Sequence, residues 1–175
     1  MFDLKKPLFR KNFFIKSKNL ILEKGNLINF NSINKIFTEH KSEGIFHLGA
    51  QTQVLDAFKE PYDTYQTNLI GTLNILEVLR KKKINVPLLY SSSDKAYGEL
   101  KRKYYHETDS LNGVYPYDAS KSVSDIICQS YSKTYNSKIG IVRSANIYGE
   151  CDFNLNRIIP ETIISILKKK TLKIR

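Results

Sequence analysis

The sequence predicts an α/β fold built on a parallel sheet, and three observations lead to this prediction. Short apolar runs alternate with segments of helical period, as parallel strands alternate with their crossover helices. The runs are apolar almost throughout, which is typical of strands buried on both faces. Polar clusters follow three of the runs, at residues 49–51, 91–95 and 144–146. Ligands bind outside the carboxyl ends of such strands, so these clusters are the candidate site.

Each expected buried strand is short and apolar, and the three strands lie at residues 44–48, 86–90 and 138–143. A further short strand is a candidate at residues 19–23, where three consecutive aliphatic residues precede Gly25. Residues 1–18 are basic and aromatic without a clear period. We therefore expect an irregular N-terminal segment at 1–18 and the folded domain at 19–175.

Helical periodicity marks four helices. Asn31 or Ser32 is the expected N-cap of the first, which runs through Phe37. Pro160 opens the last, as a helix-starting proline does. The second helix spans residues 61–83, with an inner face of Leu69, Leu73, Leu76 and Leu79 or Arg80. The third begins at Tyr117, and the residues near one of its faces are Val123, Ile126, Ile127, Ser130, Tyr131 and Thr134.

The formal net charge of +11 suggests an anionic partner, such as nucleic acid, an acidic membrane surface or a phosphorylated small molecule. The compact lysine runs, at residues 81–83 and 168–170, stand at the ends of helical segments. There they complement the helix dipole without needing a ligand. No module that reads nucleic acid accompanies the charge, so we expect no nucleic-acid binding.

No apolar run approaches the roughly 20 residues that span a bilayer, and the first residues lack a signal-peptide core. The two cysteines, Cys128 and Cys151, are far apart and have no metal-ligand spacing. His40 and His106 have no nearby metal-type partners in the sequence. We therefore expect a cytoplasmic protein with reduced thiols, no membrane association and no bound metal.

Tyr117 and Lys121 are the first candidate catalytic pair. Their spacing of four residues places both on one face of the expected helix, about one turn apart. A nearby ammonium favours the ionised phenolate, which suits a tyrosine that acts as a general base. The alternative is that Tyr117 is an aromatic residue at a helix start that covers the core. Tyr97 and Lys101 repeat the spacing, but Gly98 favours a turn there.

Ser93, Asp94 and Lys95 follow the strand at residues 86–90 and form the second candidate cluster. The Ser93 hydroxyl suits a hydrogen bond to a substrate oxygen while a phenolate takes its proton. Asp94 is a candidate acid and Lys95 a candidate base, provided that the site shifts their pKa values. The alternatives are a capped turn for the serines and a solvated pair for Asp94 and Lys95. His47, inside an apolar strand, is expected to be a hydrogen-bonded core histidine.

Five motifs in order resemble those of the extended short-chain dehydrogenase/reductase family, the NAD-dependent nucleotide-sugar epimerases and dehydratases. They are HLGAQ at residues 47–51, TNLIGT at 67–72, SSSDKAYG at 91–98, YDASK at 117–121 and RSANIYG at 143–149. The resemblance covers residues 20–170 and is greatest to CDP-glucose 4,6-dehydratase-like proteins, through the Ser-Asp-Lys run and residues 157–160. It implies a Rossmann-like, doubly wound parallel sheet.

The resemblance also implies a reaction, in which NAD rather than NADP serves to oxidise a nucleotide-sugar at C4. Water is then eliminated across C5 and C6, and the hydride returns to C6. By the same resemblance Tyr117 is the catalytic base, Lys121 holds the nicotinamide ribose, Ser93 helps to bind the sugar hydroxyl, and Asp94 and Lys95 serve the elimination. A 4-epimerase of the same family needs no such acid-base pair and is the alternative.

The remaining contacts are likewise implied by the resemblance. The expected cofactor-binding residues are Asn26, Leu27, Leu48, Gly49, Ala50, Gln51, Asn68, Ser91, Ser92, Tyr117, Lys121 and Ala145. The expected substrate-binding residues are Gln51, Ser93, Asn146 and Arg157. Asn26 departs from the aspartate that the family usually has beside the adenine. Family members commonly form a homodimer through helices beside the active site.

The family opens with a strand, a glycine-rich phosphate loop and a helix, but neither G-x-x-G-x-x-G nor G-x-G-x-x-G occurs here. The strands of the family's sheet lie in the order 3-2-1-4-5-6. We expect this chain to start at strand 3, without the first β-α-β unit that contains strands 1 and 2. Strand 3 would then lack its neighbour in the sheet. We therefore expect a chain truncated at both ends that binds NAD weakly and turns over little. The alternative of another class is a non-catalytic fragment or subunit that completes its sheet with a partner chain.

Overall fold

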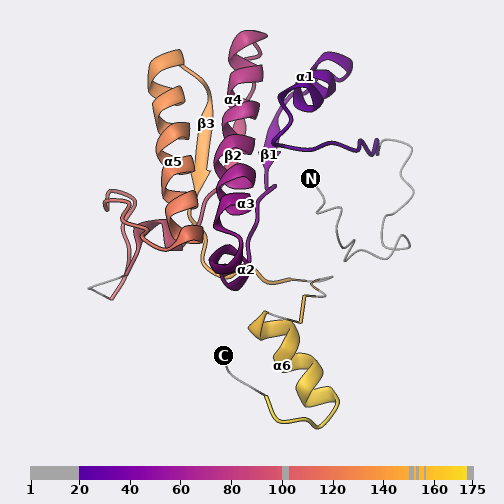
Figure 1. Ribbon diagram of the computed structural model, residues 1–175, viewed down its shortest axis with the longest axis vertical. Coiled ribbons are helices and arrows are strands. Elements are labelled where there is room, and N and C mark those ends of the chain that lie inside the picture. The colour runs from indigo at the N-terminus through magenta and orange to yellow at the C-terminus, as the bar shows by residue number, and fades with distance from the viewer. Residues whose placement is uncertain (1–19, 100–102, 150–151, 153, 156, 173–175) are drawn as a thin grey trace. The chain divides into compact units, whose positions relative to one another are not determined.

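A parallel three-stranded sheet is the centre of the fold in this computed structural model, which describes residues 20–99, 103–149, 152, 154–155 and 157–172 (Figure 1). Residues 22–145 form one compact unit, and the residues from 146 onward belong to a second unit. The strands β1 (Ile45–His47), β2 (Leu88–Ser91) and β3 (Ile139–Val142) pair in the order β1-β2-β3. The sheet confirms the predicted α/β class and the positions of the three predicted strands, but β1 and β3 are only partly buried.

Helices cover one face of this sheet. The chain forms α1 (Phe30–Glu39), α2 (Val54–Lys59), α3 (Pro61–Tyr65), α4 (Gly71–Lys81) and α5 (Pro116–Tyr135), together with the π-helical turn η1 (Gln66–Ile70) and the 3-10 turn η2 (Asp94–Tyr97). Figure 1 shows α4 and α5 over the same side of the strands. The buried core lies between these helices and the sheet and contains Leu27, Ile33, Ile75, Leu76, Val78, Leu79, Leu88, Tyr90 and Cys128. Burial of this apolar surface is the main contribution to the stability of the unit.

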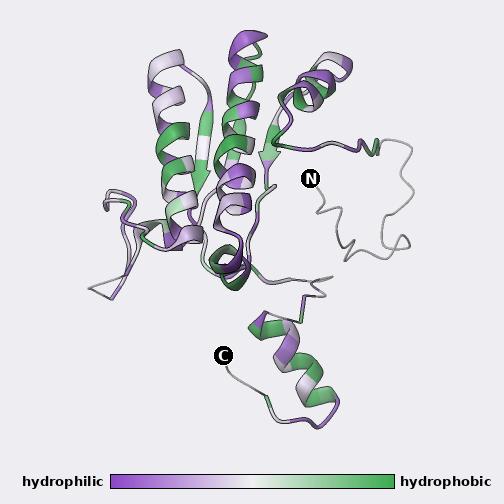
Figure 2. Ribbon diagram, in the orientation of Figure 1, coloured by the Kyte–Doolittle hydropathy of each residue, from purple (hydrophilic) through white to green (hydrophobic). Residues whose placement is uncertain are grey.

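The opposite face of the sheet carries exposed apolar side chains. Figure 2 shows that the strands are among the most hydrophobic parts of the unit. Phe46 is 75% exposed, and Leu48 just after β1 and Val142 on β3 are also exposed. Parallel sheets are normally covered on both faces, so this face is unusually bare for its composition. In the part of the chain that the structure describes, β1 pairs with β2 alone, which leaves its outer edge open.

The strand proposed at residues 19–23 is wrong for residues 20–23, which have no regular structure. Residue 19 lies outside the described residues. Aliphatic residues form a strand only where a neighbouring strand accepts their backbone hydrogen bonds, and no described strand pairs with this segment. The N-cap prediction for α1 also needs correction. Asn29 is the cap, because its side chain accepts a hydrogen bond from Ser32 N at 3.0 Å.

The long helix predicted at residues 61–83 is present, but the π-helical turn η1 interrupts it between α3 and α4. A π turn takes in an extra residue, so every later side chain rotates to a new direction. The buried positions of α4 consequently include Ile75 and Val78. Leu69 and Leu73, expected on the inner face, are only half-buried. Leu76 and Leu79 are buried as predicted.

The apolar face predicted for α5 is confirmed only in part, because Ile127 and Tyr131 pack against the core. Val123 and Ile126 are exposed, whereas the buried positions are mostly small or charged: Tyr117, Asp118, Ser120, Lys121, Ser122, Ser124, Asp125 and Cys128. Hydroxyl groups on a helix bury without penalty when they bond to backbone carbonyls, as the hydroxyls of Ser122 and Ser124 do. The periodicity of apolar residues therefore does not predict a buried helix face that is made of serines.

The second unit contributes α6 (Ile158–Leu167). Pro160 is its third residue rather than its first, and it is the buried residue of the helix. Ile163 and Ile166 are exposed. Among the described helices, none has the length and apolar character needed to cross a membrane.

Candidate active site

Lys121 is the most unusual residue at the carboxyl ends of the strands. It lies one turn into α5 and is only 3% exposed. Its Nζ donates a hydrogen bond to the carbonyl of Ser91, the last residue of β2, at 2.8 Å. The Nζ also lies 5.2 Å from the centre of the Tyr90 ring. Burial lowers the pKa of Lys121 from 10.5 to about 8, because an ammonium loses solvation there.

Tyr117 lies on the first turn of the same helix and is buried, so the predicted pair does share one helix. The start of α5 is fixed by Pro116 at a position that requires no N–H donor. It is also fixed by Gly113, where a Cβ atom would lie 2.5 Å from the Asp118 carbonyl oxygen. Gly113 N donates to the Ala96 carbonyl at 3.2 Å, which ties this loop to η2. Local packing therefore determines where Tyr117 is presented.

Ser93, Asp94 and Lys95 lie at the start of η2, which packs against α5. The Ser93 hydroxyl caps this turn, because it accepts a hydrogen bond from Lys95 N at 3.2 Å. It also donates to Asp94 Oδ1 at 3.1 Å. The capped turn expected as the alternative is therefore present, and it places Ser93 as a buried hydroxyl beside α5. Asp94 is half-buried and Lys95 is exposed.

Asp118 is a candidate functional residue that the sequence reasoning missed. It is buried on the first turn of α5, directly after Tyr117. Burial raises the pKa of its carboxyl group, while the positive charge of Lys95 acts in the opposite direction. The negative charge of Asp94 raises the pKa further. Two carboxylates and an ammonium therefore share this part of the site. The signal in the sequence was a carboxylate inside the YDASK motif, which a helix dipole also explains.

Asn68, at the centre of η1, connects the loop after β1 to α5. Its Oδ1 accepts a hydrogen bond from Gln51 N at 2.7 Å, and its Nδ2 donates to the Gln51 carbonyl at 3.0 Å. The same Nδ2 donates to Ser120 Oγ at 2.9 Å. Gln51 itself donates from Nε2 to the Gln53 carbonyl at 2.8 Å, and its buried Oε1 has no hydrogen-bond partner among the described residues. A buried acceptor without a partner is uncommon in a folded protein.

Arg143, just after β3, braces the site from the other side. Its Nε and Nη2 donate to the two carboxylate oxygens of Asp125 at 2.8 and 3.0 Å. Its Nη1 donates to Tyr97 Oη and to the Glu107 carbonyl, each at 2.9 Å. Asp125 is fully buried on α5, so the bidentate pair joins α5 to the end of β3, and the bond to Tyr97 adds η2 to this frame.

The other predicted cofactor contacts differ in their surroundings. Asn26 is exposed, and its Oδ1 accepts from Ile28 N at 3.1 Å in a tight turn. Leu27 points into the core, where it packs under Gly71. The segment after β1 is partly open, with Leu48 exposed and Gly49 and Ala50 half-buried. Ser92 is buried and Ala145 is exposed at the end of the unit.

Asn146 and Arg157, the two remaining predicted substrate residues, belong to the second unit. Both side chains are exposed there. Arg157 Nη1 forms an ion pair with Asp152 Oδ2 at 3.4 Å. Their part in a common site with Tyr117 remains a prediction from the resemblance.

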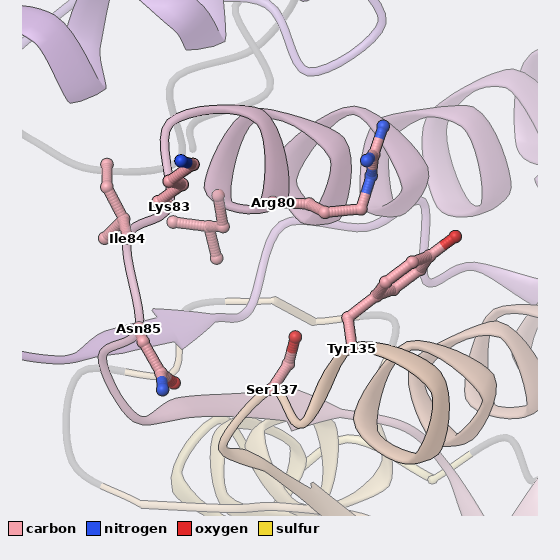
Figure 3. Close-up of a pocket in the computed structure, with 7 residues that line it drawn as sticks. Arg80, Lys83, Ile84, Asn85, Tyr135 and Ser137 are labelled. Carbon is pink, nitrogen blue, oxygen red and sulfur yellow. The ribbon is translucent and has the colours of Figure 1, made fainter.

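A cavity of about 320 Å³ lies elsewhere, and its lining residues include Arg80, Ile84, Asn85, Tyr135 and Ser137 (Figure 3). Arg80 and Tyr135 lie in the last turns of α4 and α5, and the other three residues lie in the segments that precede β2 and β3. The cavity therefore lies at the amino ends of the strands, away from the candidate site. The guanidinium of Arg80 is already engaged, by Glu77 at 2.6 Å and by the Tyr135 ring at 5.3 Å.

His40 has the metal-type neighbours that the sequence did not indicate. Potential ligand atoms of His40, Glu23 and Glu39 lie within 4.8 Å of one another. Each of them has a protein partner, because His40 Nε2 contacts Glu23 at 3.1 Å and Lys35 contacts Glu39 at 3.7 Å. We interpret this cluster as surface ion pairs.

The fold and the site define a Rossmann-like α/β protein of the short-chain dehydrogenase/reductase type, with a tyrosine and a lysine on one helix at the strand ends. More narrowly, the chain belongs to the GDP-mannose 4,6 dehydratase family, whose sequence profile matches residues 6–175. This confirms the predicted resemblance to the extended branch.

Known relatives bear out this assignment. The chain is 30% identical to dTDP-D-glucose 4,6-dehydratase of Dictyostelium discoideum over 167 residues, which are 89% of this chain and 38% of that protein. The structure of dTDP-glucose 4,6-dehydratase from Bacillus anthracis in complex with NAD is 29% identical, with a TM-score of 0.72 over 85% of this chain and 45% of that chain. UDP-glucose 4-epimerase from Thermotoga maritima with UDP-glucose is also 29% identical, with a TM-score of 0.70 over 76% of this chain and 43% of that one. This chain thus spans less than half the length of each.

Proposed function

We propose that this chain provides the catalytic edge of an NAD-dependent nucleotide-sugar 4,6-dehydratase. The observation that carries the proposal is the buried Lys121 ammonium, one turn after Tyr117 and anchored at 2.8 Å to the carbonyl that ends β2. A structural lysine is rarely buried without a carboxylate partner, so its position calls for a function. The Bacillus anthracis dehydratase, whose structure holds NAD, and the Dictyostelium dehydratase support this choice.

The residues present fit a nicotinamide cofactor. Lys121 offers an ammonium to a ribose hydroxyl, and the unpaired Gln51 Oε1 offers an acceptor at the end of β1. NAD, when bound here, supplies the acceptor and later the donor of a hydride. In the first step the Tyr117 phenolate takes the proton of the sugar C4 hydroxyl as the C4 hydrogen leaves with its electron pair. Lys121 favours the phenolate, and the Ser93 hydroxyl would turn its hydrogen from Asp94 to the same sugar oxygen.

Asp94, Lys95 and Asp118 serve the proposed second step, the elimination of water. A C4 ketone acidifies the C5 hydrogen, so a base can remove it as a proton while the C6–oxygen bond breaks. Lys95 is the proposed base, and Asp94 the proposed acid that protonates the departing hydroxyl to give water. Asp118 adds a second carboxyl whose pKa burial raises, which favours its protonated form. Lys95, which holds the C5 proton after the elimination, would return it to C5 as the hydride that NAD supplies adds to C6. A 4-epimerase, as in the Thermotoga maritima relative, would skip this elimination.

Calorimetric titration with NAD tests the cofactor site. We expect weak binding, because the 175 residues contain no glycine-rich phosphate loop. Lys121→Ala should weaken it further, while Tyr117→Phe should leave affinity nearly unchanged. Lys133→Ala, which changes an exposed lysine on the same helix, is the matched control and should bind like the wild type. Equal affinity of Lys121→Ala and the wild type, or a folded chain that does not bind NAD, would overturn the cofactor proposal.

Incubation of the chain with NAD and either dTDP-glucose or CDP-glucose tests the reaction. Proton NMR distinguishes the two family chemistries, because a 4,6-dehydratase converts the C6 hydroxymethyl group to a methyl group. An epimerase inverts C4 and leaves C6 intact. Tyr117→Phe is the negative control. A product inverted at C4 without a methyl signal would favour the epimerase, and no conversion by an NAD-binding chain would contradict both.

The exposed sheet face favours a second candidate function, a subunit that completes its sheet with another polypeptide. Phe46 is 75% exposed next to the open edge of β1, where a parallel strand and its helix would bury it. The first β-α-β unit of the Bacillus anthracis dehydratase is a suitable probe. We expect this probe to co-purify with the wild-type chain and to strengthen its NAD binding. We expect it not to co-purify with the Phe46→Lys variant. Failure of both chains to retain the probe would refute this candidate.

A further inference from the structure

His47 is a buried titratable residue that the proposed mechanism does not use. It lies at the end of β1, is 4% exposed, and packs against Tyr90 with 5.4 Å between the ring centres. Burial, and secondarily the charge of Lys121, lower its pKa from 6.5 to about 3. The ring is therefore neutral at physiological pH, and one of its two nitrogens carries a hydrogen. Its Nε2 lies 2.9 Å from Thr72 Oγ1.

The hydrogen-bond chemistry of Thr72 determines which nitrogen carries that hydrogen. A threonine hydroxyl has a single hydrogen, and Thr72 Oγ1 lies 2.6 Å from the Asn68 carbonyl oxygen. A carbonyl oxygen only accepts, so the Thr72 hydrogen points to Asn68. Toward His47 the hydroxyl must then act as acceptor. The His47 Nε2 is consequently the protonated nitrogen, and the hydrogen bonds run in one direction, from His47 through Thr72 to Asn68.

The end of this chain of hydrogen bonds is the π-helical turn that carries Asn68. The Asn68 carbonyl also lies 3.0 Å from Ser124 Oγ on α5, whose single hydrogen it shares with the Ser120 carbonyl at 2.7 Å, so the Thr72 hydroxyl is its main side-chain donor. Single π-helical turns inside α-helices are uncommon and require such local support. The side chain of Asn68 is thereby held against Gln51 and Ser120, at 2.7 and 2.9 Å.

The hydrogen bond between His47 Nε2 and Thr72 Oγ1, at 2.9 Å, favours the side-chain rotamer of Thr72 that makes this possible. Threonine in a helix divides between two χ1 rotamers, because its hydroxyl can bond backward in either. A buried N–H donor on β1 favours the rotamer whose oxygen faces the strand and whose hydrogen reaches Asn68. An apolar residue in place of His47 gives no such preference. The imidazole thus acts on the site through two other residues.

We propose that His47 is a positioning residue of the candidate active site, and that its Nε2–H group orients the Thr72 hydroxyl onto the Asn68 carbonyl and so fixes the π-helical turn that presents Asn68 to Gln51 and Ser120. The assignment deepens the proposed function and rests on it, because Gln51 and Asn68 matter for catalysis only if they line the cofactor site. The hydrogen-bond network itself is independent of that function.

Long-range ¹H–¹⁵N NMR of the histidine rings tests the first half of the proposal. The chain has three histidines, so His47→Gln identifies the His47 signals by their loss. We expect the His47 ring to show the neutral form with hydrogen on Nε2, unchanged between about pH 5 and pH 8. A ring with its hydrogen on Nδ1 would overturn the proposal.

The Asn68 side-chain amide tests the second half. In His47→Leu its NH₂ signals should shift, and its hydrogens should exchange with water about tenfold faster, as the loss of one buried hydrogen bond gives. His47→Gln retains an N–H donor and should stay closer to the wild type. Thr72→Val against Thr72→Ser repeats the comparison from the other partner, should His47→Leu fail to fold. Unchanged Asn68 signals in the folded Leu and Val variants would refute the positioning role.

NAD titration of the same variants separates this proposal from the proposed function. If the wild type binds NAD, His47→Leu and Thr72→Val should weaken binding, and His47→Gln and Thr72→Ser should restore most of it. If the Asn68 signals respond as expected but no variant binds NAD, the network stands and the cofactor proposal fails. If NAD binds equally to all variants, the positioning role fails and the cofactor proposal stands.

Discussion

Replacement of Lys121 by methionine should stabilise the folded protein at pH 7 and destabilise it at pH 10. The perturbation removes the charge and keeps the length of a side chain that is 3% exposed. Burial lowers the pKa of Lys121 from 10.5 to about 8, so the folded protein holds the lysine proton less tightly than the unfolded chain. Stability therefore rises with pH between about pH 8 and 10.5, where the unfolded chain carries more protons.

The magnitude follows from those two pKa values. Below pH 8 both states carry the proton, and the folded state bears the full penalty of about 3 kcal/mol. At pH 10 less than about 1 kcal/mol of that penalty remains. The methionine variant escapes the penalty but leaves the Ser91 carbonyl without its 2.8 Å partner, which costs about 1–3 kcal/mol at either pH. Lys121→Met should thus be about 1 kcal/mol more stable than the wild type at pH 7 and less stable at pH 10, because the wild type gains about 2.5 kcal/mol over that range.

Urea denaturation of the wild type and of Lys121→Met at pH 7 and pH 10 measures how the difference in their free energies of unfolding changes with pH. Lys133→Met is the control, because Lys133 lies on the same helix but is exposed. Its difference from the wild type should be small and equal at the two pH values. A Lys121→Met difference that does not change between pH 7 and pH 10 would show that the ammonium is not desolvated, and the argument for a functional lysine would lose its basis.

Two further predictions concern the frame of the site. Arg143→Ala should lower the free energy of unfolding by about 3–5 kcal/mol in urea denaturation, since it leaves the fully buried Asp125 carboxylate unpaired. A second change, Asp125→Ala, should then recover part of the loss, and fully additive losses would contradict the pairing. Gly98→Ala should lower the melting temperature markedly, because its φ is +76° and a Cβ would lie 2.3 Å from the Asn112 carbonyl oxygen. Gly149→Ala has open space around it and should leave the melting temperature unchanged, so equal effects of the two changes would count against this packing.

The positions of the strands and of the candidate catalytic pair were predictable because their signals are local. An apolar run of about five residues has few alternatives to a buried strand, and all three such runs form strands. The spacing of Tyr117 and Lys121 needed only that the segment be helical, which Pro116 at its start ensures. Ser93 was found because parallel strands collect polar residues at their carboxyl ends.

The failures share a different cause. The buried face of α5 is polar, and its burial depends on carbonyl acceptors supplied by η1 and η2, which are distant in sequence. Asp118 could not be predicted as a site residue, because only the packing of the fold brings Asp94 and Lys95 close to it. The segment at residues 20–23 has the composition of a strand but no described partner strand.

The sequence by itself determined the α/β class, the order of the parallel strands along the chain and the placement of the candidate catalytic pair on one helix, because these depend on hydrophobic periodicity and short spacings. Only the tertiary structure decided that Lys121 loses its solvent and that a π-helical turn shifts the face of α4. It alone joined His47, Thr72 and Asn68 by hydrogen bonds. Desolvation and hydrogen bonding depend on which atoms meet across the fold, and these contacts join residues that lie far apart in the chain.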